Sequence, residues 1–169
     1  KLLGGPNLSV YVDVVKNPDL LLDPNILPYY AFRMEESVML KRPTALRNQV
    51  STQAILPYAL YYGKLYIDKE RLSFSRAEFA LSMDDRNKAT EAILRKKPFG
   101  LRFKPVEVAF LVTYKERDGM SYLSYIRNEV RFKCDWKRKL FSTNYTIVSE
   151  MVVTDGKEQN NSIPYRMSF

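Results

Sequence analysis

Apolar and polar residues alternate with a period of two over most of the chain. This alternation is typical of β-strands that bury one face, because successive side chains point to opposite sides of a sheet. Short turn-like segments separate the alternating runs, so we expect the strands to pair antiparallel. The pattern predicts strands over residues 30–40, 47–56, 58–67, 72–83, 106–115, 122–136 and 141–151.

Two segments depart from this period. Residues 85–97 show a helical pattern that begins at Asp84 or Asp85 as the N-cap and stops before Pro98. Three basic residues fall in its last turn, where they complement the helix dipole. Its apolar stripe is narrow, so we expect this helix to lie on a sheet face. In residues 7–18 the apolar residues have helical spacing, but several of them are β-branched valines, which favour a strand. Asn7 as an N-cap and Asn17-Pro18 as a stop favour a helix.

The loop around Asp118-Gly119 sets the register of the two longest predicted strands. A two-residue loop would place Phe110 opposite Arg127, and hence a charge on an apolar face. We therefore predict a three-residue loop, 117–119, with Gly119 left-handed as a bulge. This loop pairs Phe110 with Ile126 and Val106 with Val130. The basic turn at 137–140 then gives the three strands one shared apolar face, through the pairs Trp136–Phe141, Phe132–Tyr145, Val130–Ile147 and Ile126–Met151.

This shared apolar face is the candidate ligand-binding surface, and it would equally make a dry core. Asn128, predicted opposite Val108 and Ser149, is either hydrogen-bonded within a core or a polar contact inside a ligand cavity. The opposite face is apolar at one end only, where we expect the 85–97 helix to cover it. The candidate lining residues are Phe110, Ile126, Asn128, Val130, Phe132, Trp136, Tyr145, Ile147 and Met151.

The chain is basic, with 27 Lys and Arg against 19 Asp and Glu. Phe132 and Trp136 alternate with Arg131 and Lys133, so aromatic and cationic side chains point to opposite faces and are not expected to grip one nucleic acid strand together. A solvated strand face with a basic hairpin tip is the favoured interpretation, and attraction to an anionic membrane surface is a second. The residues of that tip are Lys137, Arg138 and Lys139.

The composition excludes several classes of site. With no histidine and one cysteine, the chain has no Ser-His-Asp or Cys-His site, no His/Cys zinc cluster and no internal disulfide. No nucleotide-binding fingerprint or nucleophile elbow is present. We expect a protein without enzymatic activity, metal or cofactor. No apolar run approaches the ~20 residues of a membrane-spanning helix, so we expect no such span.

Several long stretches carry a family resemblance. They are GGP with DVVKNP (4–18), YYGKLYIDKERL with SRAEF (61–79), RKKPFGLRFKP (95–105), and YLSYIRNEVRFKCDWKRKLF with SEMVVTD (122–155). They resemble the region that follows a carboxypeptidase-regulatory-like domain in cell-envelope proteins of Bacteroides-type bacteria. The resemblance implies a periplasmic or outer-membrane-associated location, with a signal peptide and a transthyretin-like β-sandwich upstream in the complete protein. The GKLYID…RAEF element is also similar to a strand pair of LolA-like lipoprotein carriers, which implies a curved sheet around an apolar cavity.

Together these features predict one β-rich domain over residues 1–169, the C-terminal part of a longer envelope protein. The expected fold is mainly β (α+β), a strongly curved antiparallel sheet of LolA-like half-barrel type with one or two helices. The first functional hypothesis is a non-enzymatic module that binds a lipid, acyl chain or hydrophobic peptide on the concave face. The second is a protein-interaction domain in an outer-membrane assembly that uses a sheet edge or the basic hairpin.

Overall fold

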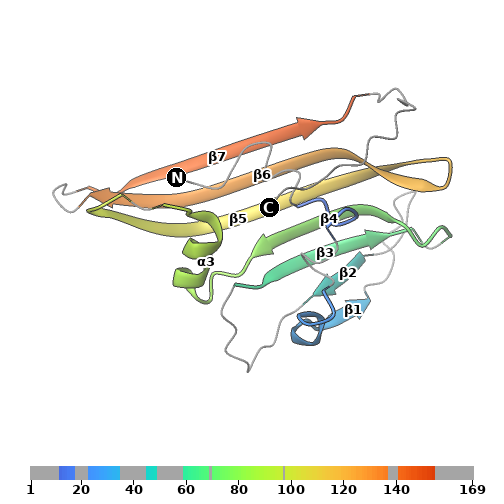
Figure 1. Ribbon diagram of the computed structural model, residues 1–169, viewed down its shortest axis with the longest axis horizontal. Helices are drawn as coiled ribbons and strands as arrows, with labels where there is room; N and C mark the ends of the chain where they lie inside the picture. The colour runs from blue at the N-terminus through green and yellow to red at the C-terminus, as the bar shows by residue number, and fades with distance from the viewer. Residues whose placement is uncertain are drawn as a thin grey trace, which may run out of the picture.

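The computed structural model describes residues 12–17, 23–34, 45–48, 59–68, 70–96, 98–136 and 141–154. They form one antiparallel sheet in which every strand pairs with its neighbours in the chain, in the order β1-β2-β3-β4-β5-β6-β7 (Figure 1). Within these residues the fold is mainly β with one α-helix, and the sheet does not close. The strands are β1 (Phe32–Met34), β2 (Ala45–Asn48), β3 (Tyr61–Ile67), β4 (Phe74–Leu81), β5 (Leu101–Arg117), β6 (Met120–Trp136) and β7 (Thr143–Val152).

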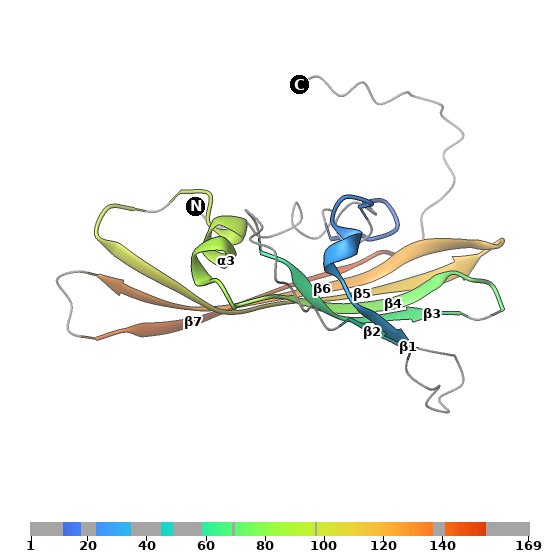
Figure 2. The same ribbon diagram turned by 90° about the horizontal axis from the view of Figure 1, so that it is seen from below.

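Two short helices lie on one side of the sheet. They are the 3-10 helix η1 (Leu27–Tyr29) and the α-helix α3 (Arg86–Ile93), and Figure 2 shows both above the same face. We call this side the covered face and the other side the open face. The α-helix begins where the sequence predicts, because Asp85 Oδ1 accepts from the N–H groups of Asn87 and Lys88 at 2.9 and 3.2 Å. These bonds lower the pKa of Asp85, and the one to Lys88 contributes most.

The predicted helix is wrong in its end and in its position. It stops at Ile93, with Leu94 already extended, so the basic residues predicted for its last turn lie beyond it. Ala89 and Ile93 pack into the main core, on the same face as Phe110 and Ile126. The helix therefore covers the apolar face of the long strands and leaves the mixed face open. The mixed face contains its own charge pairs, described below, and has less apolar surface to bury.

The described part of the N-terminal segment, residues 12–17, forms turns and not the predicted helix. Asp13 explains this, because its Oδ1 accepts from the N–H groups of Val15 and Lys16 at 3.2 and 3.5 Å, an Asx turn that competes with helical bonding. Val12 and Val14 are buried in the core, and Asp13 is buried with them. The hydroxyl of Tyr114 on β5 donates to the same oxygen of Asp13 at 3.1 Å. This bond joins residues far apart in the chain and holds the segment on the sheet.

Tyr114 gives the fold a pH-dependent contact. Burial and the nearby Asp13 charge raise the pKa of its phenol well above the ordinary value. In the unfolded chain the phenol of Tyr114 has a pKa of about 10. Its contribution to the free energy of unfolding is therefore complete below about pH 10, and above this pH it falls by up to about 1.4 kcal/mol per pH unit. We expect Tyr114→Phe to cost about 1–3 kcal/mol at pH 7 and to make the alkaline loss of stability shallower. Urea unfolding at pH 7, 9 and 10.5 measures both, and equal alkaline slopes in the two proteins would contradict this assignment.

The loop between β5 and β6 has two residues and not three. Asp118 and Gly119 both have positive φ, 54° and 76°, as a type I′ turn requires, and Arg117 pairs with Met120. A register shift between Thr113 and Tyr114 then places Phe110 opposite Asn128 and not opposite Arg127, on the same buried face as Ile126 and Val130. The predicted pairs Phe110–Ile126 and Val106–Val130 and the position of Asn128 opposite Val108 are therefore wrong. The observed pairs are Val112–Ile126, Phe110–Asn128 and Val108–Val130.

The pairing of β6 with β7 is the predicted one. Phe132 faces Tyr145, Val130 faces Ile147, Ile126 faces Met151 and Asn128 faces Ser149. The remaining predicted pair is absent, because Phe141 precedes the first residue of β7. The basic turn with Lys137, Arg138 and Lys139 lies outside the described residues. The long strands thus share one apolar face, as the alternation indicates.

Candidate interaction surface

The nine predicted surface residues divide into a buried and an accessible group. Phe110, Ile126, Asn128 and Val130 are buried among the residues of β4, α3 and segment 12–17. The sequence leaves open whether these four residues line a ligand-binding surface or form a core, and their burial places them in the core. The other group lies at the β7 side of the same face, where Phe132 and Met151 are half-buried and the remaining three are exposed. These three are Trp136, Tyr145 and Ile147.

A row of aromatic rings leads from the core to the sheet edge. Phe103 on β5 is buried, and its ring centroid lies 4.9 Å from that of Phe132 on β6. The Phe132 ring stacks in turn on Tyr145 of β7 at 5.4 Å. Such ring pairs contribute about 0.5–1.5 kcal/mol beyond their buried area. We call Phe103, Phe132 and Tyr145 the aromatic ladder, and it fixes the exposed Tyr145 ring at the edge of the sheet.

Cys134 lies on the same face, opposite Phe103 of the aromatic ladder on one side and Thr143 on the other. Burial, helped by the Asp135 carboxylate, raises the pKa of its thiol. A thiol with a raised pKa holds less of the thiolate that reacts, so Cys134 is a poor nucleophile. It acts as a small apolar side chain beside the rings.

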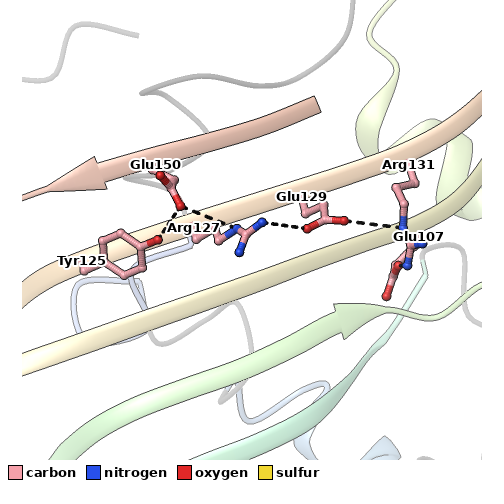
Figure 3. A network of polar contacts seen from close by, with 6 residues as sticks. All are labelled: Glu107, Tyr125, Arg127, Glu129, Arg131 and Glu150. Carbon is pink, nitrogen blue, oxygen red and sulfur yellow. Dashed lines mark hydrogen bonds and ion pairs between the residues drawn. The ribbon is translucent and has the colours of Figure 1, made fainter. Parts of the chain in front are cut away.

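The open face carries a chain of charge pairs, drawn in Figure 3. The Tyr125 hydroxyl donates to Glu150 Oε1 at 2.7 Å, and Arg127 Nε lies 3.7 Å from the same oxygen. Arg127 Nη2 donates to Glu129 Oε2 at 3.2 Å. Arg131 pairs with Glu129 and with Glu107. Both arginines in this row of charge pairs, Arg127 and Arg131, have a carboxylate beside them. This suits a solvated strand face and leaves little unpaired charge there.

A shallow groove lies on the open face beside these pairs. It has a volume of about 410 Å³, and the directly paired Ala80 and Ala109 are among the residues that line it. Arg76 and Glu78 form an ion pair at one side, and Arg127 and Glu129 do so at the other. The groove lies above these two alanines, whose side chains are short. The charges of these two arginines are paired within the protein, and Lys64 also lines the groove.

β7 is the edge strand beside the accessible residues. Val148 and Val152 are exposed on its open face, while Tyr145 and Ile147 are exposed on its covered face. Val148 is not among the surface residues that the sequence predicts, because the alternation places it with the solvated residues. An available signal was the composition of residues 143–152, which contain one charged residue and no proline.

The described residues contain no candidate metal site and no candidate membrane-spanning helix. No group of three or more potential ligand side chains lies together among them, and none of their helices has the length and apolar content to cross a membrane. No protein-family model matches the chain, and searches of curated proteins and of solved structures return no match.

Proposed function

We propose that this domain is a non-enzymatic interaction module of the bacterial cell envelope that binds an extended hydrophobic segment of a partner protein along β7. The observation that carries the proposal is the exposure of both faces of this edge strand, with the aromatic ladder leading to it. The envelope location rests on the family resemblance described above. A partner strand added at a sheet edge gains affinity from main-chain bonds and specificity from alternate side chains.

The main-chain groups available on β7 follow from its register. The N–H of Val153 donates to the carbonyl of Ser124 at 2.9 Å, in the same pairing that continues through β7 without a shift. Hydrogen-bonded and non-hydrogen-bonded pairs alternate in an antiparallel ladder. The odd-numbered residues therefore bond to β6. The outward-facing N–H and C=O groups belong to Asn144, Thr146, Val148, Glu150 and Val152.

The edge lacks the features that prevent strand addition. Natural edge strands are protected by lysine, proline, bulges or inward-pointing charges. Within β7 the single charge is Glu150, and Tyr125 and Arg127 already bind its carboxylate. Its pairing with β6 contains no bulge. An unprotected edge of this length is an aggregation hazard unless a partner uses it, which supports a binding role.

Side chains on the covered face give the proposed site its selectivity. Tyr145, Ile147 and Met151 alternate with the outward-bonding residues, so an added strand places every second side chain against them. Tyr145 is held by its stack on Phe132. A partner with apolar residues at alternate positions fits this surface.

A substitution in the middle of the edge tests the proposal. The probes are ten-residue peptides selected from a displayed library for binding to the parent domain. We expect Val148→Lys to weaken their binding by about tenfold or more, because a lysine on an edge strand opposes strand addition. Val106→Lys is the matched control, since both valines are 46% exposed and Val106 lies on the internal strand β5. Fluorescence polarisation measures the affinities. Equal losses in the two variants would place peptide binding elsewhere.

Amide exchange supplies an independent readout of the same proposal. On peptide binding, the even-numbered amides of β7 should gain protection from hydrogen exchange, while the odd-numbered ones are already bonded to β6. Peptides that bind without protecting Thr146, Val148 and Glu150 would contradict strand addition.

A lipid or acyl chain on the same surface is the second candidate, favoured by the accessible apolar group at Phe132, Trp136 and Ile147. Native mass spectrometry of the domain purified from an envelope-containing host distinguishes the candidates. A co-purifying lipid-sized mass, lost in Ile147→Asp, favours the lipid, and an apo mass together with peptide binding favours the strand.

A further inference from the structure

One end of the sheet carries exposed aromatic side chains beside unpaired cations. At this end β5 begins, β6 ends and β7 begins, because Leu101 pairs with Trp136 and Cys134 pairs with Thr143. Figure 1 shows these strand ends together at the left of the molecule. The Asp118-Gly119 turn lies at the opposite end of the β5–β6 hairpin. We call the first of these the aromatic end.

Three aromatic side chains at this end are exposed, and two of them are among the most exposed large hydrophobic residues of the described chain. Phe99, in the turn before β5, is 97% exposed, and Phe141, before β7, is 81% exposed. Trp136, the last residue of β6, is 47% exposed. Exposed rings at the extremity of a sheet are costly in water and are well suited to the interfacial region of a bilayer, where one part of a ring is apolar and another is hydrated.

The cations of the aromatic end differ from those in the middle of the open face. Arg127 and Arg131 are paired with carboxylates, whereas Arg102, Lys104 and Lys133 make no ion pair within the described part of the chain. Lys104 lies directly opposite Lys133, an arrangement of like charges that destabilises a strand pair. Asp135 lies opposite Arg102, and no ion pair joins these two described residues. The arrangement leaves a net positive charge that an anionic surface would neutralise.

The spacing of rings and charges matches a membrane surface. Lys133 lies three residues behind Trp136, or about 10 Å along the strand, within reach of lipid phosphates when the ring is at headgroup depth. Trp136 lies on the covered face of β6 and the cations lie on the open face, at the same end of the sheet. A bilayer that meets the end of the sheet contacts both, whereas a nucleic acid strand lying along one face would not.

We propose that the aromatic end attaches this domain to an anionic lipid surface, with Phe99, Trp136 and Phe141 in the interface and Arg102, Lys104 and Lys133 on the headgroups. This attachment is separate from strand addition along β7. It combines a small apolar insertion with charge attraction, and each anchor alone is weak. It also gives a role to the opposed lysines Lys104 and Lys133, whose like charges repel each other in the isolated fold.

Trp136 is the single tryptophan of the chain and reports on the attachment directly. Vesicles of phosphatidylcholine with phosphatidylglycerol, and vesicles of phosphatidylcholine alone, are the two probes for the full chain. We expect co-sedimentation and a blue shift of Trp136 emission with the anionic vesicles only. Binding should fall at least tenfold between 50 and 500 mM salt, because exposed charges are screened. Brominated lipid should quench the bound tryptophan.

Charge variants locate the attachment. Lys104→Gln with Lys133→Gln should weaken binding to anionic vesicles about 25-fold, at about fivefold for each charge. Lys115→Gln with Arg117→Gln is the matched control, because it removes the same charge from the other end of β5 and should change binding little. Phe99→Ser with Phe141→Ser should reduce the blue shift. All six positions are compatible with a folded domain, since these side chains are exposed.

Three results would overturn the proposal. The first is equal binding to the two kinds of vesicle, and the second is an equal loss in the two charge-variant pairs. The third is tighter binding to a single-stranded oligonucleotide than to anionic vesicles at the same salt. Because β7 is unchanged in these variants, peptide binding by Val148 and its neighbours remains measurable, and the two proposals fail independently.

Discussion

Ile126→Asp should unfold the domain, whereas Ile147→Asp should leave it folded. Ile126 is completely buried between β5 and β7, and its neighbours offer no cation to an ionised carboxylate. Burying such a group without a partner costs more than about 4 kcal/mol, a large part of the stability of a small domain. Ile147 is 43% exposed on the next strand, so a carboxylate there remains in water. We expect a cost below about 1.5 kcal/mol, measured by urea unfolding followed by circular dichroism.

The two isoleucines are each other's control, because they lie on the same face of the sheet and carry the same side chain. Similar large losses at both positions would mean that β7 is covered in solution, and the proposed accessible edge would then be wrong. A folded Ile126→Asp variant would instead show that the centre of the sheet is open to water. The pair therefore tests the division between core and interaction surface directly.

Gly63→Ala should be the most damaging small substitution in the described sheet. A Cβ at this position would lie 2.0 Å from the Glu78 carbonyl oxygen and 2.6 Å from the Phe79 Cα, both in the main chain of β4. Because backbone atoms cannot rotate away, β3 and β4 would have to separate. We expect a loss of at least about 3 kcal/mol in the free energy of unfolding.

Gly100→Ala is the control for this substitution. Gly100 has a positive φ of 82°, and a Cβ there would meet nothing within 4 Å. Its cost is the conformational one alone, about 1–2 kcal/mol. If chemical denaturation gives a larger loss at Gly100 than at Gly63, the close approach of β3 and β4 is not present in solution.

The sequence predicts the class of the fold because its main signal is local. The alternation of residues in β5 and β6 identifies two strands and a shared apolar face without reference to the rest of the chain. The register of that pair is not local. The shift between Thr113 and Tyr114 changes the parity of pairing, and no side chain there signals it. With regular pairing from the turn onward, a two-residue loop would place Phe110 opposite Arg127, so the alternation alone disfavours the loop that the structure has.

The site is harder to predict for a similar reason. Ile126 and Ile147 occupy equivalent places in the alternation, yet one is sealed and the other is accessible. The difference arises from α3, which packs on the neighbouring strand β5, and from residues 12–14, which come from far along the chain. Both join the core of β4, β5 and β6, whereas Tyr145 and Ile147 of β7 stay exposed. The Asp13–Tyr114 bond joins residues 101 positions apart. A pattern within one strand contains no information about such a contact.

The sequential strand order also has a consequence for how the chain acquires its structure. Each strand pairs only with the strand before or after it in the chain, so the loops that must close during folding are short and their entropy cost is small. We expect the β5–β6 hairpin, closed by a type I′ turn, to pair early, because its contacts are the most local of the long strands. Contacts such as Asp13–Tyr114 join distant residues and are expected to form later. A further strand added at β7 would repeat the antiparallel pairing that joins each described strand to the next.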